Sequence, residues 1–399
     1  MLKPGAGALT LLLGALIAIA PLTMDIYLAS MPSMSQSLSA APDQVQLTLS
    51  IYMYAWGCAQ LAAGPLSDRL GRRPALLWGL GIFVAASVVC ALSQNVWTLI
   101  GGRLVQGLMM APIAIVPRAI ARDLYTGEKA AHLLSLMGMV LGIAPIVAPI
   151  IGSHLHVWFG WQANFVFVAA CGAILFAWTW AALPETLRES NPRATDPRVI
   201  AGNYARLLRS RRYRVYLMVA AFGQSGLFAF LAGSSFVFVS AMGRGETGFS
   251  WLFGSVMLGN LMGATISSRL VRRVGIDRLI GTGTLLMLVS GAALAVLAVL
   301  RVDHPLAVVA PMFVFMVALM MTMPGAVAAA LTPFPDIAGS ASSLMYFVQL
   351  AVASTAALIV GLTFDGSARP MALTIGVAAL GTFLSFRFAK RAGTTPGEL

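Results

Sequence analysis

The sequence predicts an all-α membrane protein of twelve transmembrane helices, arranged as two six-helix bundles with both termini in the cytoplasm. Hydrophobic residues make up 59% of the 399 residues and charged residues only 10%, and the mean hydropathy is +0.85. Twelve apolar runs approach the roughly 20 residues that cross a bilayer, and the basic residues gather in alternate loops. This composition excludes a water-soluble globule, so the net charge of +12 indicates membrane orientation and not a nucleic-acid partner.

The apolar runs form two sets of six. They cover residues 8–30, 45–66, 75–93, 97–117, 132–153 and 162–183, and then 214–241, 249–268, 278–300, 305–330, 339–363 and 371–389. The longest polar stretch separates the two sets. We therefore predict an N-terminal bundle at 1–183, a cytoplasmic linker at 184–213 and a C-terminal bundle at 214–399. The first run lacks a small-residue cleavage site, so we expect it to be a retained span.

The basic residues orient the predicted helices. Of the 26 lysines and arginines, 22 lie in the termini and in loops on the side of the linker. Arg244, Arg301 and Arg369 lie on the other side, and Arg103 lies inside a run. Loops rich in lysine and arginine stay in the cytoplasm. Because one helix too many or too few would break this alternation, the same distribution favours twelve spans.

A short basic stretch, GPLSDRLGRRP at residues 64–74, lies between the second and third runs. We predict a tight turn here, since Gly71 tolerates a positive φ and Pro74 can open the next helix at its first position. The stretch resembles the signature G-x-x-x-D-R-x-G-R-R of the major facilitator superfamily. An ordinary basic loop would explain the arginines but not the glycines and the aspartate. The resemblance implies the major facilitator fold and a conformational switch at Gly64, Asp68, Arg69, Gly71, Arg72 and Arg73.

Part of this stretch recurs later in the chain. Arg69, Leu70, Arg72 and Arg73 have counterparts 200 positions on, at Arg269, Leu270, Arg272 and Arg273. We interpret the recurrence as an internal repeat of two halves, with a binding site between them near mid-membrane.

Asp25 is the only one of the fourteen acidic residues inside a predicted span. A charged carboxylate at membrane depth is unfavourable, so such a residue usually faces a protein interior or wet cavity and has a function. Burial favours the neutral acid, and we expect Asp25 to take up a proton and to release it when another conformation favours the anion. The alternative places Asp25 at the outer end of its helix, solvated or capping, because Pro32 and Ser33 follow within two turns.

Arg103 lies at a similar predicted depth, in Gly102-Arg103-Leu104-Val105-Gln106-Gly107. We predict that Asp25 and Arg103 act together in proton coupling, either ion-paired or linked through Gln106. The alternative is a structural arginine that reaches the outer headgroups. The R-x-x-Q-G string resembles the fourth-helix motif of the same superfamily, whose arginine is implicated in proton transfer.

Run 132–153 is rich in small residues and contains two prolines. Small residues four apart let helices approach closely, and prolines weaken the backbone hydrogen bonding, so this helix is expected to bend and slide. Residues 148–153 partly resemble the antiporter motif G-P-x-x-G-G, with Ala148 and Ser153 in place of two glycines. We add Pro145, Pro149 and Gly152 to the conformational switch, and antiport is favoured over symport.

Several segments resemble the Bcr/CflA drug-efflux branch, whose members export bicyclomycin, chloramphenicol and florfenicol. They are residues 25–28, 31–32, 46–50, 144–152 and 184–187, with 336–341 in the second half. Ala29 replaces the usual proline, and Ile17 stands where one multidrug relative has a glutamate, which favours neutral or singly charged substrates.

The resemblance implies a proton-coupled secondary transporter that exports small amphipathic drugs or metabolites across a bacterial inner membrane by alternating access. Its partners would be the substrate, protons and the lipid bilayer, without nucleic acid, and it would act as a monomer. It would need no cofactor beyond the proton gradient. The sequence offers no G-x-S-x-G, H-E-x-x-H or phosphate-binding glycine loop, so an intramembrane enzyme is disfavoured.

Candidate substrate-binding residues are aromatic and amide side chains, several of them three or four residues apart, where they share a helical face. For each of them ordinary helix packing is an equal alternative. The set is Tyr52, Trp56, Gln60, Gln106, Gln224, Phe228, Asn260, Tyr346 and Gln349.

A methionine stripe follows the tenth run, at Met312, Met316, Met320 and Met323. Thioethers suit an adaptable apolar cavity and also copper(I), and some members of the branch resemble copper importers. An importer of a small solute or of copper(I) is therefore the alternative function. No histidine joins the stripe, and the three cysteines stand singly, so we predict core packing and no metal site.

Asp68 is expected to dock against the positive N-terminus of the helix that begins near Ala338, which would latch the two halves when the cavity faces outward. Asp68→Asn should therefore impair transport and leave ligand binding intact. A flux assay beside a binding assay tests this, and unchanged flux would refute the docking role.

Overall fold

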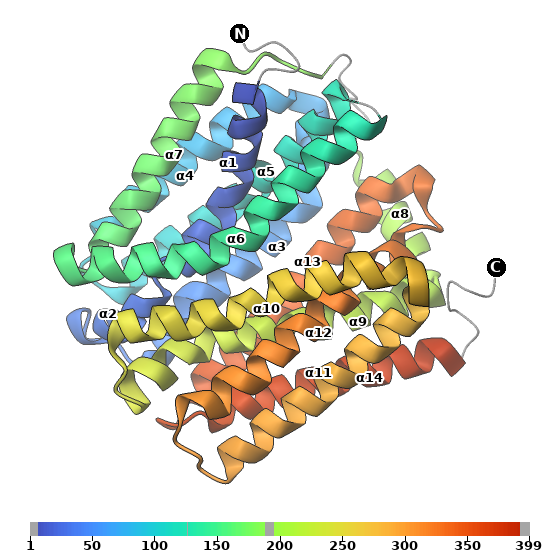
Figure 1. Ribbon diagram of the computed structural model, residues 1–399. Helices are drawn as coiled ribbons and strands as arrows, with labels where there is room; N and C mark the ends of the chain where they lie inside the picture. Colours follow the sequence, from blue (N-terminus) through green and yellow to red (C-terminus); the bar gives the residue numbers. More distant parts are fainter. Residues whose placement is uncertain (1–6, 126, 188–194, 392–399) are drawn as a thin grey trace. The chain divides into compact units, whose positions relative to one another are not determined.

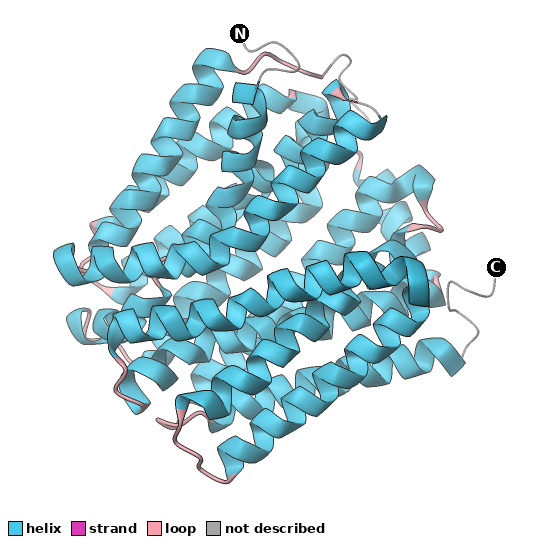
Figure 2. Cartoon of the chain, in the orientation of Figure 1, coloured by secondary structure: helices cyan, strands magenta, loops and turns pink. Residues whose placement is uncertain are grey.

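The computed structural model describes residues 7–125, 127–187 and 195–391, and these ranges are helical without a β-strand (Figure 2). The first helices are α1 (Gly7–Asp25), the 3₁₀ turn η1 (Leu28–Ser30), α2 (Met31–Ser37), α3 (Pro42–Leu70), α4 (Arg72–Ala91), α5 (Val96–Leu124), α6 (Gly127–Phe159) and α7 (Gln162–Ala182). They are followed by α8 (Pro197–Arg209), α9 (Arg211–Ser235), the π-helical turn η3 (Phe236–Ala241), α10 (Gly245–Val274), α11 (Ile276–Val299), α12 (Pro305–Leu331), η4 (Pro335–Ile337), α13 (Ala338–Leu362) and α14 (Arg369–Arg391).

Eleven helical segments in the described ranges are long and apolar enough to cross a membrane, the first being the composite of α1, η1 and α2. The predicted run 45–66 falls on α3, which is 29 residues long but is not among the eleven. Polar residues such as Gln44, Gln46 and Gln60 lower its hydropathy. The sequence pattern of twelve runs thus matches eleven qualifying segments and one long, more polar helix.

The chain divides into two compact units, residues 1–40 with 51–201 and residues 41–50 with 202–399. In the first unit, coloured blue to green in Figure 1, α4 packs between α5 and α7, and α1 packs against α5, α6 and α7. α1 thus contacts three other helices of its unit. This position places its C-terminal end, with Asp25, in the interior of the unit.

In the second unit, α9 packs against α12, α13 and α14, and α11 packs against α12 and α14. The contact of α10 with α12 is close because Gly259 and Gly263 of α10 face the backbone of α12. Small residues at a spacing of four are the usual means of close helix approach in a membrane. The same contact accounts for two members of the methionine stripe, since Met316 and Met320 pack on these glycines.

The predicted linker at 184–213 contains a helix. α8 lies within it, and α9 begins at Arg211 after Ser210, whose hydroxyl accepts a hydrogen bond from the Tyr213 N–H. In the second unit Arg206 of α8 pairs with Asp336 of η4, and the Asn203 amide donates to Ser340 of α13. The boundaries of the two predicted bundles remain predictions.

The residues that recur at an offset of 200 do not all occupy equivalent positions in the two units. The reversal in the first unit is made by Gly71 (φ 100°) and that in the second by Gly275 (φ 80°). Arg72 opens α4, whereas Arg272 lies in the last turn of α10. Arg73 and Arg273 differ in the same way, whereas Arg69 and Arg269 both precede their turns. Similar basic composition therefore does not fix the position of a helix end.

Candidate functional site

Asp25 stands at a break in the first membrane-length segment. α1 ends at this residue, and the chain continues through a turn at Ile26 and Tyr27 into η1 and α2. The Asp25 side chain is 1% exposed, and among the described residues it is the only buried acidic side chain. Its Oδ1 atom has no hydrogen-bond partner. The solvated or capping alternative is therefore not the arrangement found here.

Arg103 lies in the interior of the same unit, on α5, with no exposed surface. Its guanidinium donates to the Thr23 carbonyl oxygen (3.3 Å) and to Oε1 of Gln106 (3.0 Å), and it lies 3.4 Å from the Tyr27 hydroxyl oxygen. All three acceptors are neutral. This burial excludes the alternative in which the side chain reaches outward, and the predicted link through Gln106 is present on the arginine side.

Two aromatic rings flank the guanidinium. Cζ of Arg103 lies 4.6 Å from the ring centre of Tyr27 and 4.1 Å from that of Tyr52. A desolvated cation–π contact contributes about 2 kcal/mol, and hydrogen bonds that involve a charged group contribute about 1.5–3 kcal/mol. Because removing an ion from water costs several kcal/mol, these contacts together can keep Arg103 charged in the interior. Arg103 contacts the Thr23 carbonyl oxygen and the Tyr27 hydroxyl, which belong to the residues two before and two after Asp25, so the arginine and the carboxyl lie in one buried cluster.

Gln106 is held at both ends. Its Oε1 accepts from Arg103, and the Cys90 thiol lies 3.7 Å from the same oxygen. Its Nε2 donates to the Ser87 hydroxyl (2.7 Å). Gln106 was predicted to contact substrate, and in this structure its amide is used within the protein.

Gly152 of α6 packs directly on the break after α1. A Cβ atom at this position would overlap the carbonyl oxygen of Ile26, the residue next to Asp25. This contact explains the glycine of the partial antiporter motif, because only a residue without a side chain lets α6 approach so closely. Pro145 and Pro149 lie inside α6, which continues as one helix through both.

Three hydroxyls anchor the segment after the break, and the sequence reasoning missed them. Ser30 accepts a hydrogen bond from Asn164 (2.9 Å) and Ser37 accepts one from Trp161 (2.8 Å), while Ser33 lies 3.1 Å from His156 Nε2. The serines are three and four residues apart, so they share one helical face. That spacing was the available signal. The result is that η1 and α2 are fixed to the end of α6 and the start of α7.

The basic stretch at 64–74 is more helical than predicted. α3 continues through it to Leu70, and the reversal is made by Gly71 alone, whose φ of 100° is positive as predicted. α4 begins at Arg72, so Pro74 is its third residue and the prediction that it opens the helix was wrong. Gly64 lies within α3.

Carboxylates organise the turn, and two of them were not predicted. Arg72 pairs with Asp68 and with Asp123 (3.1 Å), and its guanidinium also donates to Ser67. Glu185 accepts from the backbone N–H groups of Arg72 (3.0 Å) and Arg73 (3.1 Å), the first two residues of α4. An acidic side chain at a helix N-terminus satisfies free N–H groups and the helix dipole. The predicted docking of Asp68 stays a prediction.

Glu185→Ala should lower the stability of the protein by about 1–2 kcal/mol, the usual contribution of a helix N-cap. Two N–H groups of α4 would lose their acceptor, and the Gly71 turn, where a Cβ would lie 2.6 Å from Glu185 Oε2, would loosen. Thermal unfolding of the purified protein measures the loss. Glu185→Gln keeps one good acceptor and should lie between wild type and alanine; an alanine variant as stable as wild type would contradict the capping role.

Three substrate candidates on α3 share a property. The Tyr52 hydroxyl, Trp56 Nε1 and Gln60 Oε1 are all buried without a hydrogen-bond partner, and the rings of Tyr52 and Trp56 lie 6.2 Å apart. Arg69, on the same helix, donates to Thr195 (3.0 Å).

In the second unit, the candidates differ in exposure. Phe228 and Gln349 are buried, and Tyr346 is 40% exposed. Gln224 and Asn260 are half-buried, and the Asn260 amide lies 3.5 Å from Met257 Sδ.

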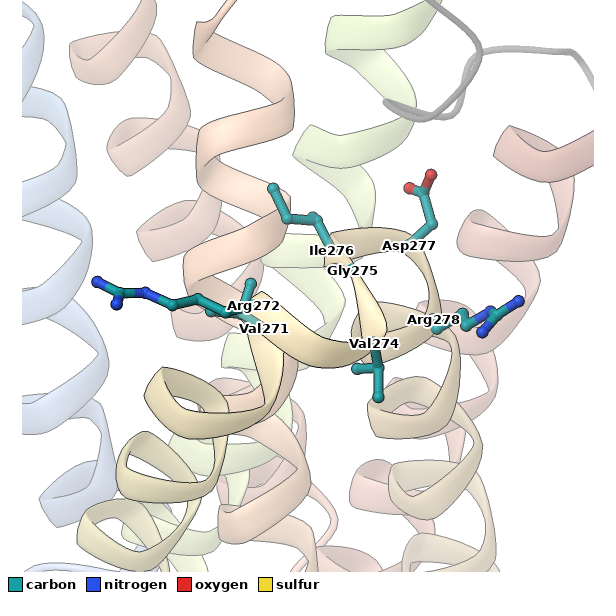
Figure 3. A pocket seen from close by; sticks show the side chains of 7 residues that line it. All are labelled: Val271, Arg272, Val274, Gly275, Ile276, Asp277 and Arg278. Atoms are coloured by element: carbon teal, nitrogen blue, oxygen red, sulfur yellow. The ribbon is translucent and has the colours of Figure 1, made fainter.

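A surface hollow lies at the α10–α11 turn, lined by residues 271–272 and 274–278. Figure 3 shows that Arg272 and Arg278 extend to opposite sides of it and that Asp277 points away from both. The charged groups therefore do not converge on one point of the hollow. The described residues contain no cluster of three or more histidine, cysteine or acidic side chains that could hold a metal ion.

The family model of the Major Facilitator Superfamily matches residues 13–357. A bicyclomycin resistance protein homolog of Haemophilus influenzae is 29% identical over 379 residues, 95% of each chain. A chloramphenicol resistance protein of Pseudomonas aeruginosa is 28% identical over 382 residues, 94% of this chain and 89% of that one. Multidrug resistance protein D of Escherichia coli is 28% identical over 343 residues, 86% of this chain and 85% of that one.

Solved transporters share the fold. A peptide transporter superposes with a TM-score of 0.75 at 14% identity, over 96% of this chain and 94% of that one. The xylose transporter of E. coli superposes with a TM-score of 0.71 at 14% identity, over 96% and 97%. The resemblance to the drug-resistance branch is confirmed by the relatives. The chain belongs to the Major Facilitator Superfamily, a family of membrane transporters.

Proposed function

We propose that this chain is a proton-coupled secondary transporter that exports small amphipathic drugs or metabolites across a bacterial inner membrane by alternating access. The observation that carries the proposal is the buried Asp25 carboxyl, with one oxygen unpartnered, in the same cluster as Arg103. The proton gradient supplies the energy without a cofactor. The partners are substrate, protons and the bilayer, and the protein acts as a monomer without nucleic acid.

The chemistry of coupling rests on the charge of this cluster. With Asp25 protonated, Arg103 carries the only full charge; with Asp25 ionised, the two charges balance. In a medium of low dielectric constant the two states differ strongly in their interactions with the surroundings. A conformation that admits water to Asp25 from one side can therefore exchange its proton with that side. Export follows when proton binding favours the neutral Asp25 carboxyl and drug binding favours the Asp25 carboxylate.

The proposed membrane topology has twelve spans, which are the eleven apolar segments described above and α3. α3 has the length of a span, and its polar side chains suit a helix that faces a wet cavity and not lipid. An even number of spans puts both termini on one side of the membrane. The excess of basic residues in the linker and its companion loops supports a cytoplasmic location for that side.

The substrate class is supported by α3 and by the relatives. A buried polar group without a partner costs about 1–3 kcal/mol, and Tyr52, Trp56 and Gln60 present three such atoms. A substrate with hydroxyl, amide or carbonyl groups on an apolar body can satisfy them, and the aromatic rings can pack on that body. The relatives are named for resistance to bicyclomycin and chloramphenicol, and we extend this class of compound to the present chain.

Transport in proteoliposomes tests the proposal. Vesicles with an acidic interior and an alkaline exterior are given labelled chloramphenicol, florfenicol or bicyclomycin. At least one compound should accumulate inside, and an uncoupler should abolish the accumulation. Accumulation that instead requires an acidic exterior would support the importer alternative. Movement that is indifferent to the uncoupler would refute proton coupling.

A further inference from the structure

α11 and α14 of the second unit pack side by side and run in opposite directions (Figure 1). A Cβ atom at Gly281, early in α11, would lie 3.2 Å from the ring of Phe386, late in α14. Further along the pair, a Cβ atom at Gly291 would lie 2.8 Å from the Ala379 side chain. Glycine lets two membrane helices approach this closely. The first turns of α11 therefore lie beside the last turns of α14.

One face of α14 is apolar along the whole helix. Exposed apolar side chains recur on it at intervals of three or four residues, which places them on the same side of the helix. They are Leu373, Val377, Leu380, Leu384 and Phe388. A long exposed apolar face on a membrane protein marks contact with lipid. We therefore expect acyl chains to cover this face.

The neighbouring helix α11 has a similar face, on which Leu285 and Val289 are exposed. Towards the start of the helix, the same spacing leads through the exposed Thr282 to Arg278, which is also exposed. The apolar face of α11 thus ends in an arginine.

Arg387 occupies the corresponding place on α14. It is exposed, three residues beyond Leu384, and lies within the last two turns of the helix. Its Cζ atom lies 5.9 Å from the ring centre of Phe383. Because Gly281 of α11 is level with the residue before Arg387, Arg278 and Arg387 lie within about one helical turn of each other along the pair. Both apolar faces therefore end in an arginine at the same end of the helix pair.

The charges of these two arginines are not neutralised within the described part of the chain. Neither Arg278 nor Arg387 forms an ion pair with another described residue. Asp277, next to Arg278, points away from it (Figure 3). Long basic side chains at the end of a membrane helix extend to the level of the lipid headgroups. The two guanidiniums are thus placed to meet an anion of the bilayer.

We propose that the α11–α14 face with Arg278 and Arg387 is a binding site for an anionic phospholipid. The phosphate group accepts hydrogen bonds from the two guanidiniums, a geometry that arginine matches well. The acyl chains lie along the apolar faces of the two helices. A zwitterionic phospholipid fits less well, because its own ammonium group offsets the charge of its phosphate. This inference does not depend on proton coupling or on the substrate.

Native mass spectrometry of the purified protein tests the proposal by counting bound lipids as phosphatidylglycerol or phosphatidylcholine is added. The wild type should bind the first phosphatidylglycerol more tightly than the first phosphatidylcholine. Arg278→Gln and Arg387→Gln should each weaken phosphatidylglycerol binding by about fivefold, and the double variant by about 25-fold, the effect expected of one and two arginines at a membrane surface. Phosphatidylcholine binding should stay nearly unchanged in all three variants.

Two further variants separate a built site from general charge. Arg272→Gln removes an exposed arginine that extends to the opposite side of the α10–α11 turn (Figure 3), so its lipid binding should equal that of wild type. Replacing both Arg278 and Arg387 by lysine keeps the charges and should retain most of the preference for phosphatidylglycerol. If the double glutamine variant does not fold, as thermal unfolding would show, the two single variants carry the test.

Three results would overturn the proposal. The first is equal affinity of the wild type for the two lipids, and the second is an unchanged preference in the glutamine variants of Arg278 and Arg387. The third is an equal loss in Arg272→Gln, because the effect would then follow net charge and not a site. Each of these results would leave proton-coupled export standing, since Asp25 and Arg103 belong to the first unit.

Discussion

Asp25→Asn is expected to abolish drug accumulation driven by a proton gradient and to leave drug binding in place. The amide keeps the size and polarity of the side chain but cannot exchange a proton. A pH difference of one unit can support about a tenfold drug gradient for each proton exchanged, because a factor of ten corresponds to about 1.4 kcal/mol. In the variant this ratio should fall to about one. Proteoliposome flux and equilibrium binding measure the two properties separately.

Asp365→Asn is the matched control for this change. Asp365 is an exposed carboxylate in the loop between α13 and α14, where it accepts hydrogen bonds from Ser367. The same loss of a charge at that position should leave accumulation intact. If Asp25→Asn retained uphill transport at the wild-type rate, Asp25 would not be the coupling residue.

Gly152→Ala is expected to disable transport by displacing the break beside Asp25. The added methyl group would overlap the carbonyl oxygen of Ile26, which is backbone and cannot rotate away. α6 would have to move from α1, at a cost of about 1–3 kcal/mol or more for overpacking. Lower thermal stability and loss of accumulation should appear together, and thermal unfolding with flux measurements checks both.

Gly138 supplies the control on the same helix. A Cβ atom at Gly138 meets nothing within 4 Å, so Gly138→Ala should preserve transport and stability, since alanine favours a helix over glycine by up to about 1 kcal/mol. Equal behaviour of the two variants would show that close approach at Gly152 is not required.

The sequence predicted the helices well because their signal is local. Apolar runs of membrane length and clusters of basic residues are properties of neighbouring positions, and the described helices follow the runs. The end of α3 was placed too early, since the apolar run was ended at residue 66 although α3 continues to Leu70, with Gly64 and Pro65 inside it. Near an end of a helix, glycine and proline are tolerated when other contacts hold the backbone, so their presence alone does not mark the turn.

The sequence predicted which charged residues form the candidate site, but it did not predict the side-chain contacts between helices that hold them. Burial of Asp25 and Arg103 follows from two isolated charges in apolar runs, and depth alone suggested that they meet. The partners of Arg103 could not be inferred, because Tyr27, Tyr52 and Gln106 are common residues whose role depends on how α1, α3 and α5 rotate about their axes. Glu185 as the cap of α4 was equally hidden, since 113 positions separate it from Arg72.

The most direct measurement of the central claim is the infrared titration of Asp25 in the wild-type protein. The account predicts a protonated-carboxyl band that is present at acidic pH, disappears as the pH rises through the range in which transport operates, and is missing from Asp25→Asn. A carboxylate that stays ionised over the whole range in which the protein remains folded would contradict the account.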